Sequence, residues 1–358
     1  MFRKPEINAL FIFGFLPWIM YSGYAILSYG LLLFVLLINN KLFSAISVCV
    51  LAVLTYFIVQ SSPLFDALHG QQVLNSYNFT FGLFITILAF FTQLHIPIRT
   101  NRLIDILLWG FLGVTLAFLI SGRDVSSIYQ ISSFIISAYL VLANTLDRKI
   151  FTVLFVFGAG ARSIAAGFVT AWMWEKFKIL RSALAWPILL LLILIVGSGA
   201  IFAVISEALS DLRSEGIFLK GRTTYWLALL ETKPGFFGGG IGTSLLAIEK
   251  ILGGYQLPHN DWLRIYTDYG VIALVLVIFA LFKVSQRNYP SRIATVVLIF
   301  YMLTGNPLSF PPVITAFFLV SNSRSVTLTN KQMAAKRPSP ARSRRKRLPQ
   351  NQRKPRLR

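Results

Sequence analysis

The stretch PHNDWLRIYTDYGVIALVLVIFALF, residues 258–282, joins the end of a long polar interval to the start of a strongly apolar run. The polar interval extends from about Val204 to Gly270 and holds seven of the chain's 13 acidic residues beside six basic ones. Most other segments are apolar, in runs of about 15 to 22 residues, which is close to the length a helix needs to cross a membrane. We therefore expect a membrane scaffold that presents this polar interval.

Composition places the chain outside the soluble class. Hydrophobic residues make up 56% and charged residues 13% of its 358 residues, whereas soluble domains have a charged share of about 25%. The apolar runs predict an all-α, polytopic integral membrane protein with about 12 transmembrane helices. The expected spans are 7–22, 24–38, 42–60, 77–96, 103–120, 128–146, 149–160, 163–175, 182–203, 263–283, 292–304 and 309–320.

The distribution of positive charge predicts the orientation of these spans. Lys and Arg in short loops favour the cytoplasmic side, and most such residues fall on one side of the predicted arrangement, as at 99–102, 176–181 and 283–292. Both termini are then cytoplasmic, and the long loop of about 204–262, between the ninth and tenth spans, faces the opposite side. The first apolar stretch lacks a small-residue cleavage site, so we expect it to be retained as a span.

The net charge of +21 would by itself suggest a nucleic-acid partner, but most of it lies near the C-terminus. From Arg324 to Arg358 there are 13 Lys or Arg and no acid, which leaves 21 − 13 = +8 for the remainder. This tail is also rich in Pro, Ser and Gln, a composition typical of disorder. We expect a transmembrane catalytic domain at 1–323 and a disordered basic cytoplasmic tail at 324–358. Attraction to membrane lipids is favoured over specific nucleic-acid binding.

The long loop itself contains a pattern of local order. Apolar residues at helical spacing predict a short amphipathic helix on the membrane surface. Glycine clusters at 238–242 and 253–254 would supply the turns on either side of it. The apolar residues of this expected helix are Leu245, Leu246, Ile248, Ile251 and Leu252.

His259 is the histidine whose position points to chemistry. Pro258 precedes it, Asn260 and Asp261 follow, and a membrane span then begins. An imidazole near neutral pH is suited to proton transfer. The alternative is an interfacial histidine at a helix end capped by Asn260 or Asp261. His69 and His95 fit surface or packing positions better.

Arg162 and Arg222 are the candidate cationic residues. An arginine within an apolar segment marks by default a site facing a cavity or a partner, which applies to Arg162. The alternative for Arg162 is snorkelling to the headgroups, and for Arg222 it is an ordinary surface ion pair with Glu231 or Glu215.

Several other site classes lack their signatures. The glycine run has no Gly-Lys-Ser/Thr ending and no preceding strand, so it does not indicate a nucleotide site. One histidine and scattered carboxylates in the loop give no metal-ligand cluster, and the single cysteine, Cys49, excludes an intramolecular disulfide. No spacing singles out a pair of glycosidase carboxylates.

Three motifs resemble the O-antigen ligase family, which includes related O-antigen and exopolysaccharide polymerases. They are Gly160-Ala161-Arg162-Ser163, then Gly221-Arg222 with Trp226 and Pro234-Gly235 to Gly242, and finally Pro258-His259-Asn260 through Gly270. The last is the most specific, because His-Asn, then Leu263, then Tyr269-Gly270-Val271-Ile272 entering a membrane helix is the family's pattern. The chain departs from that pattern at Ala161, where the family has Ser, and it is somewhat short.

The resemblance implies an inverting, metal-independent membrane glycosyltransferase of the GT-C type in the bacterial inner membrane, with its site facing the periplasm. The donor would be a polyisoprenyl-pyrophosphate glycan and the acceptor a sugar of the lipid A core. Arg162 and Arg222 would bind the donor pyrophosphate, His259 would act at the acceptor hydroxyl, and Asn260 would help to bind substrate. No cofactor is implied.

Three other functions remain open from the sequence, of which one is transfer of the glycan to a protein hydroxyl. A polymerase would use the same chemistry to extend lipid-linked repeat units, and sequence separates it poorly from a ligase. A polysaccharide flippase or transporter would form no bond. Transporters usually carry charged residues at mid-membrane on broken helices, whereas the charges noted above lie at the expected outer boundary.

Overall fold

The computed structural model describes residues 26–92 and 229–322, together with positions 120–122, 150, 167, 169, 170, 173 and 226. All of them belong to one compact unit, Met1–Ser325. The described residues form helices and loops, with no strand among them. The all-α prediction is confirmed for this part of the chain. Six of the expected spans, including 7–22 and 182–203, lie outside the described residues except for isolated positions.

Three of the described helices are long and apolar enough to cross a membrane. They are α4 (Leu42–Gln60), α5 (Gln71–Phe91) and α14 (Asp261–Ser285). Three shorter apolar helices accompany them: α3 (Leu27–Ile38), α15 (Tyr289–Thr304) and α16 (Pro311–Asn322). These six helices correspond to the expected spans at 24–38, 42–60, 77–96, 263–283, 292–304 and 309–320.

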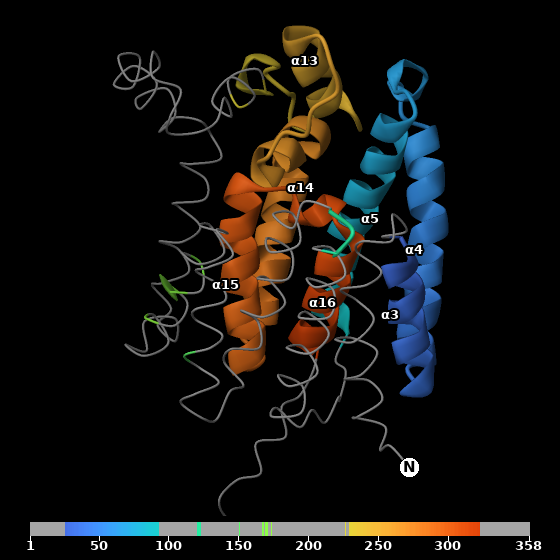
Figure 1. Cartoon of the computed structure of the whole chain (residues 1–358), viewed down its shortest axis with the longest axis vertical. Helices are drawn as coiled ribbons and strands as arrows, with labels where there is room; N and C mark the ends of the chain where they lie inside the picture. Colours follow the sequence, from blue (N-terminus) through green and yellow to red (C-terminus); the bar gives the residue numbers. More distant parts are fainter. Residues whose placement is uncertain are drawn as a thin grey trace, which may run out of the picture. The chain divides into compact units, whose positions relative to one another are not determined.

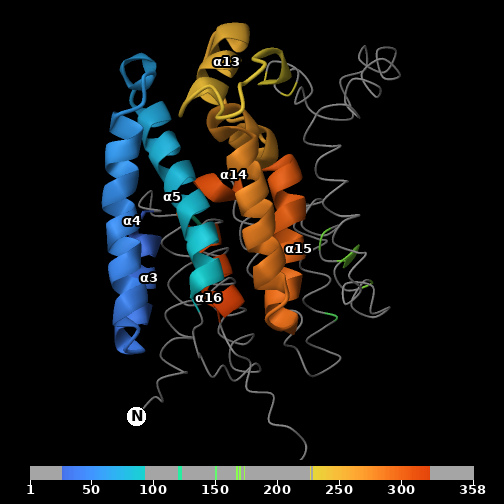
Figure 2. The ribbon, with the colours of Figure 1, turned by 180° about the vertical axis from the view of Figure 1, so that it is seen from behind.

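The helices pack around a common apolar core. α14 packs against α5 and α15, and α16 packs against α3, α5 and α15. In Figure 1 and Figure 2, α3, α4 and α5 lie together on one flank of the described bundle, and α14 and α15 lie on the other. The core includes Leu32, Phe79, Phe81, Leu281, Val297 and Phe317, all fully buried or nearly so.

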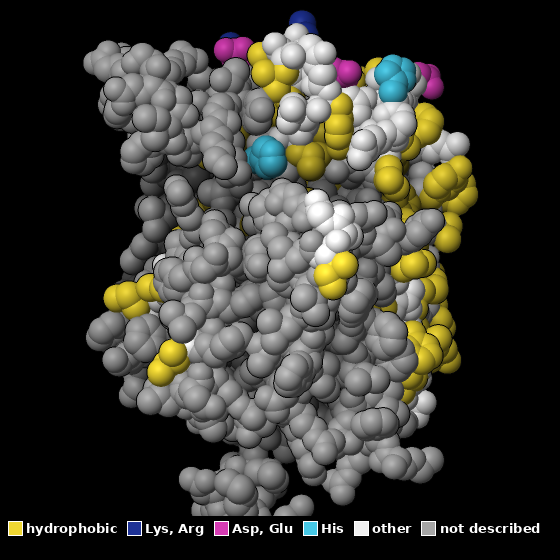
Figure 3. All heavy atoms as spheres, viewed as in Figure 1, with side chains coloured by type: hydrophobic (Ala, Val, Ile, Leu, Met, Phe, Trp, Pro, Cys, Tyr) yellow, Lys and Arg dark blue, Asp and Glu magenta, His cyan; other side chains and the backbone are white. Residues whose placement is uncertain are grey.

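Exposed hydrophobic side chains instead follow α4, where Phe43, Val53 and Phe57 point outward, as expected of a helix that contacts lipid. Figure 3 shows this apolar flank.

The turn between α3 and α4 explains why the sequence predicted this boundary well. Asn40 adopts a left-handed conformation with φ +54°. Its N–H donates to the Leu37 carbonyl, and the Lys41 N–H donates to the Leu36 carbonyl, each at 2.9 Å. This pair of bonds is the Schellman arrangement, which satisfies carbonyls that the helix end leaves unpaired. Asparagine tolerates the left-handed conformation, so the Asn-Asn pair ends the helix here.

The start of α5 differs from the sequence-based prediction. The helix begins at Gln71, not at 77, because its polar first turns are held by tertiary contacts. Gln72 is buried and its Nε2 donates to Glu249 Oε2 at 2.6 Å. Its Oε1 accepts from the His69 backbone N–H at 3.0 Å. Polar residues that looked like loop in sequence therefore continue the helix beyond the apolar run.

The short amphipathic helix predicted in the long loop is present as α13 (Thr243–Leu252). Gly242 precedes it and Gly253 follows it, both with positive φ, so the predicted glycine turns are confirmed. Leu245 and Ile248 are fully buried. Ile248 packs with Trp226, Leu229 and Leu263. The bundle end that carries α13 is called the α13 end below, and it lies at the top of Figure 1.

Helix α14 is broken at Gly270, which has φ +79° and ψ −174°. The loop before α13 replaces the helical hydrogen bonds that this break removes. Val271 N–H donates to the Phe236 carbonyl at 3.1 Å, and Gly239 N–H donates to the Thr267 carbonyl at 2.8 Å. Gly240 N–H similarly reaches the Asp268 carbonyl at 3.2 Å. The glycine loop and the break in α14 therefore stabilise each other through these hydrogen bonds.

Candidate active site

His259 lies at the α13 end, immediately before α14. It is half-buried and has a left-handed backbone with φ +52°, a conformation that costs free energy for a residue with a side chain. Its ring atom Nδ1 lies 3.4 Å from Nδ2 of Asn306, in the loop between α15 and α16. Asn306 is itself only 2% exposed. The structure therefore places the predicted catalytic histidine against a buried carboxamide from a distant part of the chain.

Asn260 forms the N-cap of α14. Its Oδ1 accepts a hydrogen bond from the Leu263 N–H at 3.1 Å, the usual way in which an asparagine satisfies a free helix N–H. The side chain is fully buried. Capping by Asn260, which the sequence suggested, is confirmed, and the cap uses the Asn260 side chain, not the His259 ring.

Asp261 joins the start of α14 to the loop between α15 and α16. It is fully buried, and its Oδ2 accepts a hydrogen bond from the Leu308 N–H at 2.8 Å. Leu308 belongs to the short 3-10 helix η5 (Pro307–Ser309). This hydrogen bond holds the loop that carries Asn306 against Asp261, at the start of α14.

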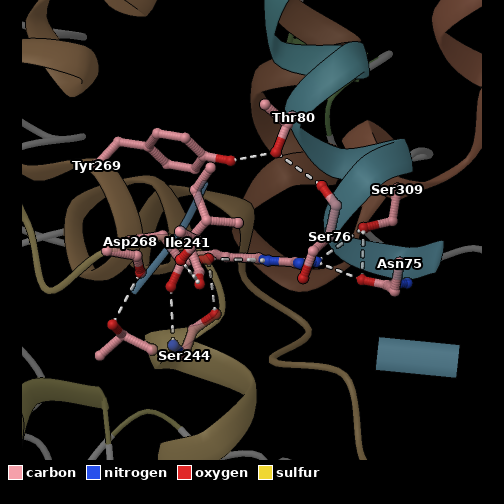
Figure 4. Close-up of polar contacts among 12 residues, drawn as sticks. Asn75, Ser76, Thr80, Ile241, Ser244, Asp268, Tyr269 and Ser309 are labelled. Atoms are coloured by element: carbon pink, nitrogen blue, oxygen red, sulfur yellow. Dashed lines mark hydrogen bonds and ion pairs between the residues drawn. The ribbon is translucent and has the colours of Figure 1, made fainter. Parts of the chain in front are cut away.

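Arg264, one turn further along α14, is fully buried. Its Nη1 donates to Asn75 Oδ1 on α5 at 2.6 Å and to Ser309 Oγ on η5 at 3.0 Å. Its guanidinium carbon lies 3.9 Å from the centroid of the Phe79 ring, an arrangement that favours a desolvated cation. A single arginine thus joins three elements at the α13 end, as Figure 4 shows around Asn75 and Ser309.

Asp268 supplies the negative charge that compensates Arg264. Its Oδ2 lies 3.5 Å from Arg264 Nε, and both side chains are 0% exposed. Its carboxylate also accepts from the Ser244 N–H at 2.8 Å and the Ser244 hydroxyl at 3.0 Å, so it holds the start of α13 (Figure 4). The next residue, Tyr269, shares a hydrogen bond with Thr80 of α5. The pair Arg264–Asp268 therefore links α13, α14, α5 and η5.

Several polar atoms of this network have no hydrogen-bond partner among the described residues. They are Asn260 Nδ2, Asp261 Oδ1, Asn306 Oδ1 and Arg264 Nη2, all buried. A buried polar atom without a partner costs free energy, and such atoms concentrate where ligands or catalysis need them. Three of the four belong to the contact between residues 260–261 and the loop that carries Asn306, next to His259.

Tyr255 lies in the loop that leads to His259. Burial raises the pKa of its hydroxyl, and the positive charge of Arg264 acts in the opposite direction. The hydroxyl is therefore protonated at neutral pH and offers a hydrogen-bond donor beside the charged network.

The structure brings two of the four sequence-predicted site residues together, His259 and Asn260, whereas Arg162 and Arg222 lie outside the described residues. Sequence reasoning missed Arg264, Asp268 and Asn306. A signal was available for the first two, because they stand one helical turn apart at the start of an expected span, where charges are costly. For Asn306 the signal was its place between Gly305 and Pro307, in a polar break between two apolar runs.

Within residues 26–92 and 229–322, no three His, Cys, Asp or Glu side chains gather as a metal ion would require. The groups that the site offers are an imidazole, carboxamides, the Asp261 carboxylate, the Tyr255 hydroxyl and one compensated ion pair. These groups suit proton transfer and hydrogen bonding to a polar substrate.

The part of the chain that the structure describes is all-helical, with three helices long and apolar enough to cross a membrane and a buried polar network at one bundle end. Comparisons with protein-family models, curated proteins and solved structures give no match to the chain. The functional assignment below therefore depends on the site and on the motif resemblance.

Proposed function

We propose that the chain is an integral-membrane, inverting glycosyltransferase. It would transfer a polyisoprenyl-pyrophosphate-linked glycan to a sugar hydroxyl of a lipid A core, as O-antigen ligases do. The observation that carries this proposal is the position of His259, half-buried at the end of a membrane-length helix with its ring against Asn306. An imidazole held in this way is suited to remove a proton from a bound hydroxyl.

The proposed reaction is a direct displacement. The acceptor hydroxyl oxygen attacks the anomeric carbon and forms the new glycosidic bond, while His259 takes the hydroxyl proton. The bond between the anomeric carbon and the phosphate oxygen breaks, and its electron pair leaves with the polyisoprenyl pyrophosphate. Attack opposite to the leaving group inverts the anomeric configuration. The scheme requires no metal ion, because the donor is already activated.

Arg162 and Arg222 would stabilise the departing pyrophosphate in this scheme. Guanidinium groups bind phosphate oxygens through charge-assisted, often bidentate hydrogen bonds, and they are most useful where negative charge develops. Arg264 is unsuited to that role, because its charge is already compensated by Asp268. Asn260 would contribute to substrate binding through Nδ2, whereas its Oδ1 caps α14.

The proposed setting is the bacterial inner membrane, with the α13 end facing the periplasm and both termini in the cytoplasm. Charge asymmetry in the sequence supports this orientation. On the face that Figure 3 shows, the coloured charged and histidine side chains lie at the α13 end, which fits an end in contact with water and polar headgroups. Membrane lipids, the lipid-linked donor and the glycolipid acceptor are the partners.

The test is glycan transfer by the purified protein in lipid vesicles with a polyisoprenyl-pyrophosphate glycan. His259→Ala is expected to lower the transfer rate by about 10²-fold or more, because it removes the base. His69→Ala is the matched control, since His69 also lies at the α13 end but is exposed and outside the network. Its rate should match that of the natural protein. Equal rates for the two variants would remove His259 from catalysis.

The choice of acceptor separates the ligase from the polymerase. Parallel reactions would supply either a lipid A core or a second lipid-linked repeat unit. A glycosylated lipid A core supports the ligase. Longer glycans that remain on the polyisoprenyl carrier would replace it with the polymerase.

A further inference from the structure

The loop between α15 and α16 carries the residue that contacts the His259 ring. Asn306 Nδ2 lies 3.4 Å from His259 Nδ1, although the two residues are 47 positions apart. Asn306 is 2% exposed, so its carboxamide packs inside the protein and meets the ring from within. The contact therefore depends on how firmly this loop is held.

Two side chains of α14 anchor the loop. Asp261 Oδ2 accepts from the Leu308 N–H at 2.8 Å, and Arg264 Nη1 donates to Ser309 Oγ at 3.0 Å. Both anchors are fully buried. Asp261 and Arg264 lie two and five residues after His259. The same end of α14 therefore supports both the His259 ring and the loop that carries Asn306.

Helix α5 limits the loop from another direction. A methyl group added at Gly82 would come within 2.2 Å of the Leu308 carbonyl oxygen. The α5 backbone therefore packs directly against η5, and this contact holds the loop against α14. Two helices, α14 and α5, hold the loop that carries Asn306, which is the arrangement expected of a residue that supports a functional group.

The chemistry of an asparagine beside an imidazole determines which ring nitrogen holds the proton. The hydrogen bond made by one ring nitrogen sets the state of the other. If Asn306 presents Nδ2, His259 Nδ1 must accept, and Nε2 carries the proton of the neutral ring. If the carboxamide turns and presents Oδ1, Nδ1 donates and Nε2 becomes the basic nitrogen. The two orientations have nearly the same shape.

We propose that Asn306 is a positioning residue whose Oδ1 accepts a hydrogen bond from Nδ1–H of His259, which leaves Nε2 as the nitrogen that takes the acceptor's proton. This inference rests on the proposed function, because only a base role requires an unprotonated Nε2. The turned carboxamide also pairs Oδ1, which otherwise is a buried acceptor without a partner.

The first test observes the ring directly and needs no substrate. The chain has three histidines, so His69→Gln and His95→Gln leave His259 as the sole site for ring-¹⁵N labelling. Nitrogen NMR of the full-length protein in lipid vesicles then distinguishes a protonated Nδ1 from a protonated Nε2. Above the pH at which the ring becomes neutral, we expect the proton on Nδ1. A neutral ring with its proton on Nε2 would overturn the proposal.

The second test uses two substitutions of nearly equal size. Asn306→Asp keeps the acceptor oxygen and removes the donor, so it should retain Nδ1–H and keep the transfer rate within about tenfold of the natural rate. Asn306→Leu removes both groups. It should lose the tautomer preference and lower kcat by about 10²-fold at an unchanged KM for the acceptor. Equal effects of Asp and Leu would contradict the assigned orientation.

The two readouts separate this proposal from the function on which it rests. A protonated Nδ1 that persists in Asn306→Asp and disappears in Asn306→Leu establishes the contact, even if no acceptor is glycosylated and the glycosyltransferase proposal fails. Transfer by the natural protein together with a protonated Nε2 would leave the enzyme in place and refute the role of Asn306. Thermal unfolding of each variant in detergent identifies loss of folding as a separate cause.

Discussion

Arg264 and Asp268 meet inside the α13 end of the bundle, where each charge depends on the other. Removing one member of a buried pair leaves an uncompensated charge and costs about 3–5 kcal/mol. Asp268 retains two hydrogen bonds from Ser244 when Arg264 is lost, whereas Arg264 keeps only neutral partners when Asp268 is lost. At the scale of the residue, this pair is the most sensitive part of the network.

Arg264→Met is therefore expected to lower the free energy of unfolding by about 3–5 kcal/mol. Lys250→Met is the matched control, because Lys250 is an exposed cation on α13, and its loss should change stability by no more than about 0.5 kcal/mol. Adding Asp268→Asn to Arg264→Met should cost less than Asp268→Asn alone. Denaturant unfolding in mixed micelles measures all four. Strict additivity of the two substitutions would show that the charges do not interact.

The sequence predicted His259 and Asn260 as site residues because they adjoin each other and a span. It could not predict the network around them, because that network joins residues far apart in the sequence. Arg264, for example, is bonded to Asn75, 189 residues away, and to Ser309, 45 residues away. Local patterns carry no information about contacts at such separations. The contact between His259 and Asn306 likewise joins residues that are 47 positions apart.

At the scale of the element, the glycine loop and the broken helix α14 stabilise each other. Span boundaries were readable from sequence, as Asn39, Asn40 and Lys41 show between α3 and α4. The break at Gly270 was not, because the residues after it form a continuous apolar run that is typical of an uninterrupted helix. What makes the break stable is a set of backbone hydrogen bonds from residues 236–240, about 30 positions earlier in the chain.

Substitution at the break should be costly. Gly270→Ala would place a methyl group 2.2 Å from the Phe236 carbonyl oxygen at a residue with φ +79°. We expect a loss of at least about 1–3 kcal/mol from backbone strain alone, measured as a lower Tm in detergent. Gly254→Ala is the control, because nothing lies within 4 Å of the added methyl group. Equal Tm values for these two variants would show that the loop does not brace the helix.

At the scale of the whole molecule, α14 relates the site to the membrane. Its 25 residues, with the break at Gly270, are long and apolar enough to cross a membrane. The buried network occupies its first turns, beside α13. At its other end, Arg287 donates to the Thr92 carbonyl at 2.6 Å and to Asn322 Oδ1 at 2.7 Å, which holds α5 and α16 there. The two ends of α14 therefore belong to different polar layers.

Residues before and after α14 should accordingly lie on opposite sides of the membrane. Cys49 is the only cysteine, so Cys49→Ala provides a thiol-free background. In it, Gly254→Cys should react with an impermeant thiol reagent added to spheroplasts, whereas Gln286→Cys should react only after lysis. Gln286 is exposed, which makes it suitable as the matched position. The same labelling before lysis at both positions would contradict a crossing by α14.

The central claim is that this protein forms a glycosidic bond, and product analysis tests it most directly. The purified protein would be incubated in vesicles with a polyisoprenyl-pyrophosphate glycan and a lipid A core, and the product identified by mass spectrometry and NMR. We expect a glycosylated core with inverted anomeric configuration and an equal amount of released polyisoprenyl pyrophosphate. A glycan that crosses the bilayer still attached to its carrier, with no new bond, would contradict the claim.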